Sequence, residues 1–167
     1  MNDWRNIEHH FTQSNRSRCS RNIRYADNLF QATFGEIYQD YETNPGNERF
    51  EQVVERIKQS FTDYFIVKAD RKSVGAIRIL KMKNGNRCRI SPIFILPDYQ
   101  NKRITQSVFK MIEELYKPEL GWELDTILEE KGNCYLYEKM GYKKTGETKR
   151  INDKLTLVYY EKEGTTE

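Results

Sequence analysis

One stretch near the middle of the chain, residues 89–114, joins an apolar strand to an amphipathic helix through a short basic turn. The apolar run ends at Pro97, the turn carries Lys102 and Arg103, and the apolar residues that follow recur with a helical period. The first backbone N–H groups of a helix have no partner inside the helix, and the helix dipole adds partial positive charge there. The stretch is therefore typical of a site that holds a phosphorylated ligand.

Length and composition limit the classes of protein to which the chain can belong. With 167 residues, 37% of them hydrophobic, the chain is long enough for one domain with its own core. We expect a polar, basic arm or an edge strand over residues 1–24, and a single domain over residues 25–167. The net charge of +3 is too small to predict a nucleic-acid partner.

Cysteine spacing and hydropathy bear on the compartment. Cys19, Cys88 and Cys134 are far apart and lack a Cys-x-x-Cys pattern, so the sequence predicts neither a disulfide framework nor a bound metal. No apolar run has the form of a secretion signal or the length of a membrane span. We expect a cytoplasmic protein without a membrane partner, present as a monomer or a homodimer.

Two helical patterns come before the first expected strand. Phe30, Phe34, Ile37 and Tyr41 recur at helical spacing, and residues 44–47 break this pattern. A second apolar stripe follows the break; its members are Phe50, Val53, Val54, Ile57 and Phe61.

Alternating patterns and turn signals predict β-structure in the rest of the chain. The expected strands are residues 64–68, 74–82, 87–96, 122–127, 142–149 and 154–162. Helices are expected at 132–140 and from 104 to just before Pro118; the stripe of the latter is Ile104, Val108, Met111, Ile112 and Leu115.

Particular residues within this pattern indicate turns and irregular pairing. Asn84-Gly85 and Asn152-Asp153 predict hairpin turns. Gly75 indicates a bulge or a close backbone approach, and Pro92 indicates a bulge or the end of pairing. Hairpins mixed with helical crossovers predict an α/β (α+β) fold with a mixed sheet.

Two sequence blocks in this order resemble the GNAT family of N-acetyltransferases. Residues 94–105, Phe-Ile-Leu-Pro-Asp-Tyr-Gln-Asn-Lys-Arg-Ile-Thr, are similar to the family's acetyl-CoA turn, usually Gln/Arg-x-x-Gly-x-Gly/Ala. Residues 133–142, Asn-Cys-Tyr-Leu-Tyr-Glu-Lys-Met-Gly-Tyr, are similar to its late helix ending in Leu-Tyr-Glu-Lys-x-Gly-Phe/Tyr. The resemblance covers residues 25–162.

The resemblance implies a fold and a cofactor. The fold is a central, mostly antiparallel twisted sheet of six to seven strands, splayed between the fourth and fifth and flanked by about four helices. The co-substrate is acetyl-CoA, with no metal. The implied cofactor-binding residues are Phe94, Ile95, Leu96, Gln100, Asn101, Lys102, Arg103, Ile104, Thr105, Asn133 and Tyr137.

The resemblance also implies roles in catalysis. Tyr137 matches the tyrosine that acts as general acid toward the departing thiolate, and the backbone N–H of Ile95 would polarise the thioester. The general base is open: Asp125 and Glu36 are weak candidates beside a water chain, which we prefer. The acceptor would be a small-molecule or peptide amine, bound near the first helix; Tyr38, Asp40 and Tyr41 are the candidate residues.

One departure from the family pattern leaves an alternative open. Arg103 and Thr105 stand where the family usually has small residues, and glycine is what lets backbone approach a phosphate closely. The main expectation is direct acetyl transfer from acetyl-CoA to a primary amine. The alternative is a non-catalytic acyl-CoA-sensing or partner-binding module on the same fold.

Overall fold

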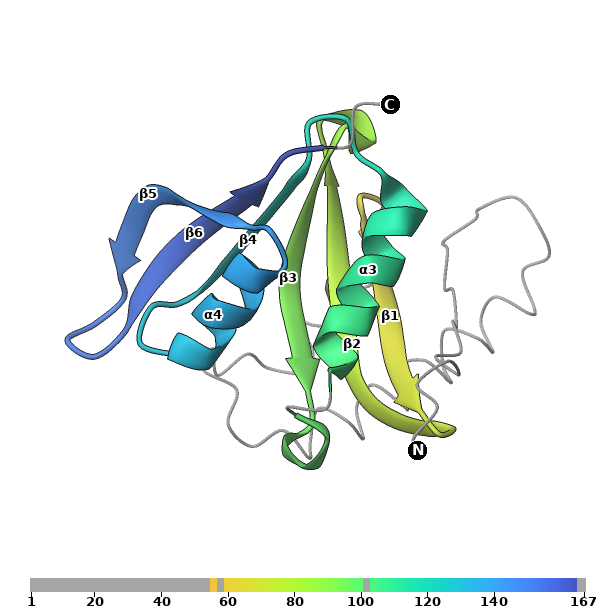
Figure 1. Ribbon diagram of the computed structural model, residues 1–167. Coiled ribbons are helices and arrows are strands. Elements are labelled where there is room, and N and C mark those ends of the chain that lie inside the picture. Colours follow the sequence, from red (N-terminus) through yellow and green to blue (C-terminus); the bar gives the residue numbers. More distant parts are fainter. Residues whose placement is uncertain (1–54, 57–58, 101–102, 165–167) are drawn as a thin grey trace. The chain divides into compact units, whose positions relative to one another are not determined.

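Six strands form the described β-structure, in the hydrogen-bonded order β1-β2-β3-β4-β6-β5 (Figure 1). The computed structural model describes residues 55–56, 59–100 and 103–164. The elements in chain order are β1 (Thr62–Ala69), β2 (Lys72–Met82), η1 (Lys83–Gly85), β3 (Arg87–Ile95), η2 (Pro97–Tyr99), α3 (Ile104–Tyr116), β4 (Trp122–Ile127), α4 (Lys131–Lys139), β5 (Lys143–Arg150) and β6 (Thr156–Lys162). The expected strands and the two later helices are confirmed within a few residues. The helix expected over residues 30–41 and nearly all of the one after residue 47 lie outside the described residues.

The chain divides into two compact units. One comprises Met1–Ile79 with Pro92–Thr105, and the other Leu80–Ser91 with Gln106–Glu167. Strands β2 and β3 contribute residues to both. The prediction of one domain over residues 25–167 stays a prediction.

The turn between β1 and β2 consists of two residues in the left-handed region. Asp70 has φ 50° and Arg71 has φ 66°. Two consecutive positive φ values between paired strands are those of a type I′ turn, whose twist matches the strands on either side. Here the turn is made without glycine, so the hairpin depends on two residues that adopt this conformation at a cost.

The turn between β2 and β3 is longer than the Asn84-Gly85 pair predicts by itself. Lys83, Asn84 and Gly85 all have positive φ, at 47°, 59° and 90°. The N–H of Asn86 donates to the Lys83 carbonyl at 3.2 Å, which closes a four-residue connection. The predicted hairpin is confirmed, with Lys83 as an additional left-handed residue.

Strand β3 changes the edge to which its backbone groups point. The N–H of Cys88 donates to the Gly121 carbonyl at the start of β4, whereas the N–H of Leu96 donates to the Val74 carbonyl in β2. In a regular strand, N–H groups eight residues apart point to the same edge. The β3–β4 register also ends at Ile90↔Leu124. An irregularity of the β-bulge type therefore lies between residues 90 and 96, as Pro92 predicts.

The second unit is built on β4, β6 and the two helices. Six antiparallel pairs join β4 to β6, from Trp122↔Lys162 to Ile127↔Leu157, and α4 lies against β4 (Figure 1). The buried face of α3 includes Val108, Phe109 and Ile112. Leu115, which the stripe predicts to be buried, is 48% exposed in the last turn of α3. Phe109, which the stripe omits, is fully buried because it packs among aromatic rings.

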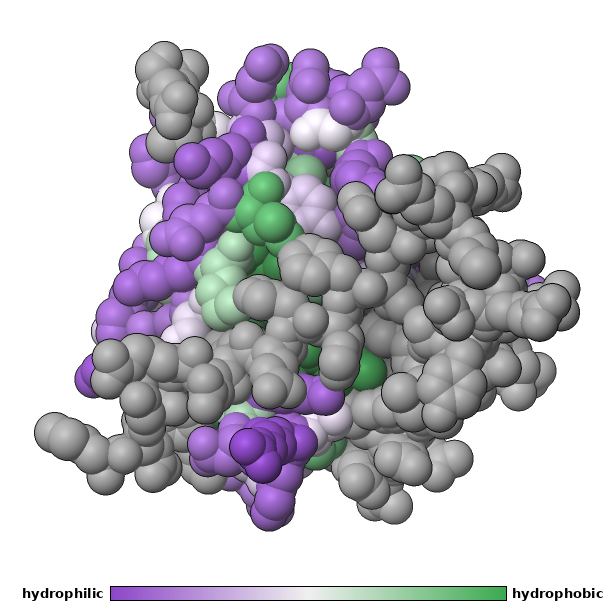
Figure 2. All heavy atoms as spheres, turned by 90° about the vertical axis from the view of Figure 1, so that its right-hand side faces the viewer, coloured by the Kyte–Doolittle hydropathy of each residue, from purple (hydrophilic) through white to green (hydrophobic). Residues whose placement is uncertain are grey.

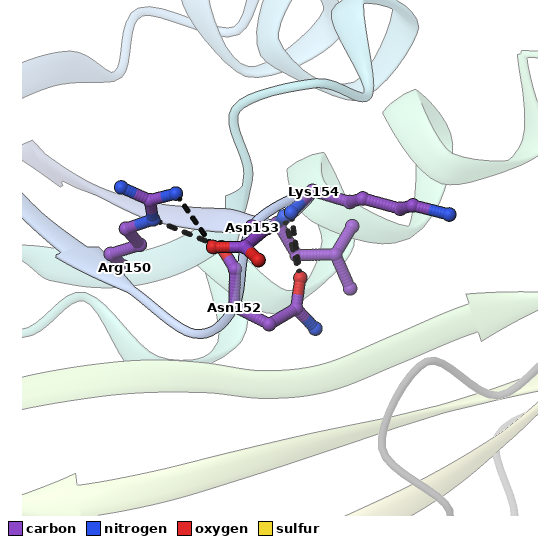
Figure 3. A network of polar contacts seen from close by, with 5 residues as sticks. Arg150, Asn152, Asp153 and Lys154 are labelled. Atoms are coloured by element: carbon purple, nitrogen blue, oxygen red, sulfur yellow. Dashed lines mark hydrogen bonds and ion pairs between the residues drawn. The ribbon is translucent and has the colours of Figure 1, made fainter.

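The turn between β5 and β6 is organised by the side chain of Asn152. Its Oδ1 accepts hydrogen bonds from the N–H groups of Lys154 and Leu155 at 2.8 and 3.0 Å (Figure 3). Arg150 pairs with Asp153 at 2.9 Å across the same turn. An asparagine side chain that bonds the backbone ahead of it stabilises a turn, so the second predicted hairpin is confirmed.

The described surface is mainly hydrophilic. Every residue of β5 is exposed, and lysine or arginine occupies half of its eight positions. Most of the described residues on the face shown in Figure 2 are likewise hydrophilic. None of the described helices has the length and apolarity needed to cross a membrane. Charge on an edge strand opposes edge-to-edge aggregation.

Gly75 in β2 has no room for a side chain. A Cβ at this position would lie 2.3 Å from the Phe94 carbonyl oxygen and 2.8 Å from the Ile95 Cδ1. The predicted close backbone approach is confirmed, and it occurs where β2 meets the end of β3.

We predict that Gly75→Ala lowers the free energy of unfolding by about 1–3 kcal/mol, because the Phe94 backbone must shift. Urea denaturation measures the loss. Gly132→Ala in α4 is the matched control, because a Cβ there meets nothing within 4 Å and alanine favours a helix. Equal stability of Gly75→Ala and the wild type would contradict the close approach.

Candidate functional site

The end of β3 is hydrogen-bonded to β2. The N–H of Leu96 donates to the Val74 carbonyl at 2.8 Å. The role expected for the N–H of Ile95 toward the thioester stays a prediction. The carbonyl of Ile95 accepts a hydrogen bond from the Gln100 side-chain amide at 2.9 Å. Gln100 thus ties the turn back to the end of the strand.

The turn after β3 leads into the N-terminus of α3. Backbone bonds from Tyr99 to Leu96 and from Gln100 to Pro97 close η2. Arg103, directly before the helix, is exposed and has φ 60°. The first turn of α3, whose residues are all described, carries no acidic side chain. Its N-terminal N–H groups and dipole therefore favour an anion. Asn101 and Lys102 lie outside the described residues.

Tyr137 in α4 lies at the centre of an aromatic cluster. Its side chain is 6% exposed, and its ring stacks on Phe109 with 5.7 Å between centroids. Tyr160 and Tyr142 meet it edge-on, at 6.1 and 6.5 Å. Gly141, with φ 90°, ends α4 directly before Tyr142, as the sequence predicts. Burial of Tyr137 and Cys134 together shows which face of α4 is turned inward.

The other predicted residues of α4 have local partners. Asn133 is half-buried and its side-chain amide donates to the Glu130 carboxylate. The Sγ of Cys134 lies 3.7 and 3.8 Å from the carbonyl oxygens of Ile127 and Leu128. Within the described residues Cys134 has no histidine beside it, since His9 and His10 fall outside them.

The candidate base Asp125 is in an ion pair. Its carboxylate accepts a hydrogen bond from Arg89, and its side chain is 20% exposed. A base must offer an oxygen to the proton of the amine, and this carboxylate already accepts a hydrogen bond from the guanidinium. Glu36, Tyr38, Asp40 and Tyr41 lie outside the described residues, so their predicted roles stay predictions. Among the described residues no group of three or more metal-binding side chains occurs.

Sequence reasoning missed a polar cluster behind the aromatic rings. The hydroxyl of Tyr142 donates to Glu113 Oε1 at 2.9 Å, and Lys162 Nζ lies 2.7 Å from Glu113 Oε2. Burial and the nearby negative charge of Glu113 both raise the pKa of Tyr142. Tyr142 and Glu113 are 29 residues apart, and Lys162 and Glu113 are 49 residues apart. No local sequence signal links residues at such separations.

Comparison with protein-family models gives a match over most of the chain. Residues 37–164 match the model described as the Acetyltransferase (GNAT) domain. The chain belongs to the GNAT acetyltransferase family. No curated protein matches it significantly.

Solved structures share the GNAT fold at low sequence identity. The spermidine/spermine N-acetyltransferase SpeG from Vibrio cholerae is 15% identical, with a TM-score of 0.64 over 78% of this chain and 88% of that one. A chimera of Vibrio cholerae SpeG and hSSAT is 16% identical, with a TM-score of 0.64 over 79% and 91%. The microcin C7 self immunity acetyltransferase MccE, in complex with acetyl-CoA and AMP, is 12% identical, with a TM-score of 0.60 over 83% and 87%. Together with the family match, these similarities confirm the fold expected from the sequence.

Arg103 has a backbone conformation that is more usual for glycine. The turn resembles the family pattern that has glycine at this position, and glycine adopts positive φ at little cost. Arg103 keeps that left-handed conformation, with φ 60°, without being glycine. The backbone of this turn therefore has a conformation that glycine adopts easily. For arginine, the same conformation destabilises the folded state by about 1–2 kcal/mol.

We predict that Arg103→Gly raises the free energy of unfolding by about 0.5–1 kcal/mol, after the greater entropy of glycine in the unfolded chain offsets part of the relief. Thermal or urea unfolding measures the difference. Arg103→Ala is the control, since alanine also removes the guanidinium but keeps a Cβ at positive φ. A gain of the same size in both variants would show that the side chain, and not the backbone, is responsible.

Proposed function

We propose that the chain is an acetyl-CoA-dependent N-acetyltransferase that moves an acetyl group directly to a primary amine of a small molecule or a peptide. The observation that carries the proposal is the turn before α3, where Arg103 holds the left-handed conformation at the family's glycine position. A costly backbone conformation that persists at one position supports a functional constraint there.

The residues of the turn fit a phosphorylated co-substrate. The start of α3 offers N–H groups and a positive dipole, and the exposed Arg103 adds a guanidinium suited to phosphate oxygens. The N–H of Ile95, at the end of β3, would donate to the thioester carbonyl. The remaining proposed contacts are those of Phe94, Leu96, Gln100, Asn101, Lys102, Ile104, Thr105 and Asn133. Acetyl-CoA bound to these groups would supply the activated acetyl thioester.

The proposed transfer forms a C–N bond and breaks a C–S bond. The uncharged amine attacks the thioester carbonyl carbon, and the phenol of Tyr137 donates a proton to the departing sulfur. A free phenol has a pKa of about 10, so it is protonated at neutral pH and can act as the acid. We propose direct transfer because Cys134, which is buried among backbone carbonyls, lacks the features of an activated nucleophile.

Deprotonation of the amine is the other half of the reaction. An alkyl ammonium has a pKa of about 10.4, so a base must take its proton near pH 7. We propose a water chain for this role, because the carboxylate of Asp125 is already paired with Arg89. The structural neighbours named for spermidine and spermine make polyamines the first acceptor class to test.

We predict that acetyl-CoA at 100 times its Kd stabilises the protein by about 2.7 kcal/mol. A thermal-shift titration measures this, with acetyl phosphate as a control donor that lacks the coenzyme. Turnover is then followed as thiol release over spermidine, spermine, an aminoglycoside and a peptide with a free N-terminus. The absence of any shift would contradict the enzyme proposal. A shift without turnover on any amine would favour an acyl-CoA-sensing module.

We predict that Tyr137→Phe lowers kcat by about 10²-fold, the usual contribution of one general acid, and leaves the KM for acetyl-CoA unchanged. Steady-state kinetics measure both. Tyr135→Phe is the control, because Tyr135 is on the same helix and is 66% exposed. An unchanged kcat in Tyr137→Phe would remove this residue from the mechanism.

A further inference from the structure

Three aromatic side chains enclose the ring of Tyr137. Phe109 stacks on it with 29° between the ring planes, and Tyr142 and Tyr160 meet it at 64° and 65°. Tyr142 and Tyr160 are each 1% exposed. The orientation of the Tyr137 ring is therefore set by these neighbours, since edge-on and offset-stacked contacts are geometrically specific.

The first of the two edge-on tyrosines is fixed by a carboxylate from α3. The Tyr142 hydroxyl donates to Glu113 Oε1 at 2.9 Å, and Lys162 binds Glu113 Oε2 at 2.7 Å. Lys162 Nζ also lies 5.4 Å from the centroid of the Tyr142 ring. A charge-assisted hydrogen bond is stronger than a neutral one, so Tyr142 is held at its hydroxyl as well as on its ring.

The second edge-on tyrosine is fixed in the same way from α4. The Tyr160 hydroxyl donates to Glu138 Oε1 at 3.1 Å, and Lys144 Nζ lies 3.2 Å from the same oxygen. The bond from Lys144, followed by that from Tyr160, lowers the pKa of Glu138. At neutral pH the carboxylate is ionised and accepts both bonds.

The two arrangements have the same chemistry. In each, a glutamate carboxylate binds a lysine and the hydroxyl of a buried tyrosine, and the ring of that tyrosine packs against Tyr137. They come from different elements, α3 with β6 on one side and α4 with β5 and β6 on the other. Each phenol has its proton engaged with a carboxylate, so neither ring can move away from its position without breaking a charge-assisted bond.

We propose that Tyr142 and Tyr160 are positioning residues, which, held by Glu113 and Glu138, keep the Tyr137 ring in the orientation for proton donation. The inference rests on the proposed role of Tyr137 as general acid. Small misplacements of a reacting group are costly, since about 1 Å can reduce a rate by about 10²-fold. Loosening either flanking ring should therefore lower kcat while the binding of acetyl-CoA is retained.

The test is a double-mutant cycle. Tyr142→Phe and Tyr160→Phe each keep the ring and remove the hydroxyl that the glutamate holds. We expect each to lower kcat by about 10-fold with an unchanged KM for acetyl-CoA, and to lower it no further when Tyr137→Phe is already present. Tyr135→Phe is the control in both backgrounds. Equal losses with and without Tyr137, or no loss at all, would overturn the proposal.

A second measurement does not need turnover. Ring-flip rates of Tyr137 are read by NMR with carbon-labelled tyrosine, the signal being assigned by its loss in Tyr137→Phe. We expect flips to be about 10-fold faster in Tyr142→Phe and Tyr160→Phe than in Tyr135→Phe. Unchanged flip rates in folded protein, verified by circular dichroism, would overturn the positioning role. Faster flips together with an unaffected kcat in Tyr137→Phe would instead contradict the proposed acid and leave the positioning intact.

Discussion

The change of hydrogen-bonding edge along β3 is the constraint on which the candidate coenzyme site depends. At Cys88 the strand bonds toward β4, and by Leu96 it bonds to Val74 in β2. Pro92 lies between the two, where a residue without an N–H group interrupts a ladder most easily. After this change the end of β3 bonds to β2, and in our proposal the N–H of the neighbouring Ile95 serves the ligand. Gly75 supports the arrangement, because any side chain there would push on the Phe94 carbonyl.

A second constraint comes from burying tyrosine hydroxyls among aromatic rings. A buried hydroxyl without a partner costs about 1–3 kcal/mol, and an isolated buried carboxylate costs more. Tyr142 and Tyr160 meet this requirement with glutamates, and the charge of each glutamate is balanced by a lysine. Two rings of the aromatic cluster are therefore held by hydrogen bonds as well as by packing. Purely apolar packing would leave its rings freer to turn.

Left-handed residues other than glycine occur at turns throughout the described chain. Asp70, Arg71, Lys83 and Asn84 lie in hairpin turns, where the turn geometry accounts for their positive φ. Arg103 is different, because it directly precedes a helix, in the turn that resembles the acetyl-CoA turn of the GNAT family. The same backbone conformation thus has a topological cause in the hairpins and, in our proposal, a ligand-binding cause at the start of α3.

The sequence by itself determined the strands, the two later helices, the hairpin turns and the family, because each depends on local patterning or on short blocks of residues. Alternation of apolar residues, Asn-Gly and Asn-Asp pairs, and the glycine after Met140 all act within a few residues of the chain. It also indicated that Gly75 and Pro92 were unusual. It did not say which carbonyl Gly75 approaches or to which edge β3 turns.

Only the tertiary structure decided how Tyr137 is surrounded. Glu113 meets Tyr142 and Lys162 across 29 and 49 residues of chain, and Arg89 meets Asp125 across 36. A lysine or a glutamate on a helix or strand gives no sign in the sequence of whether it faces water or a distant partner. Helical periodicity likewise placed Leu115 on the buried stripe and missed Phe109, because periodicity gives the face of a helix but not how far its neighbours extend along it.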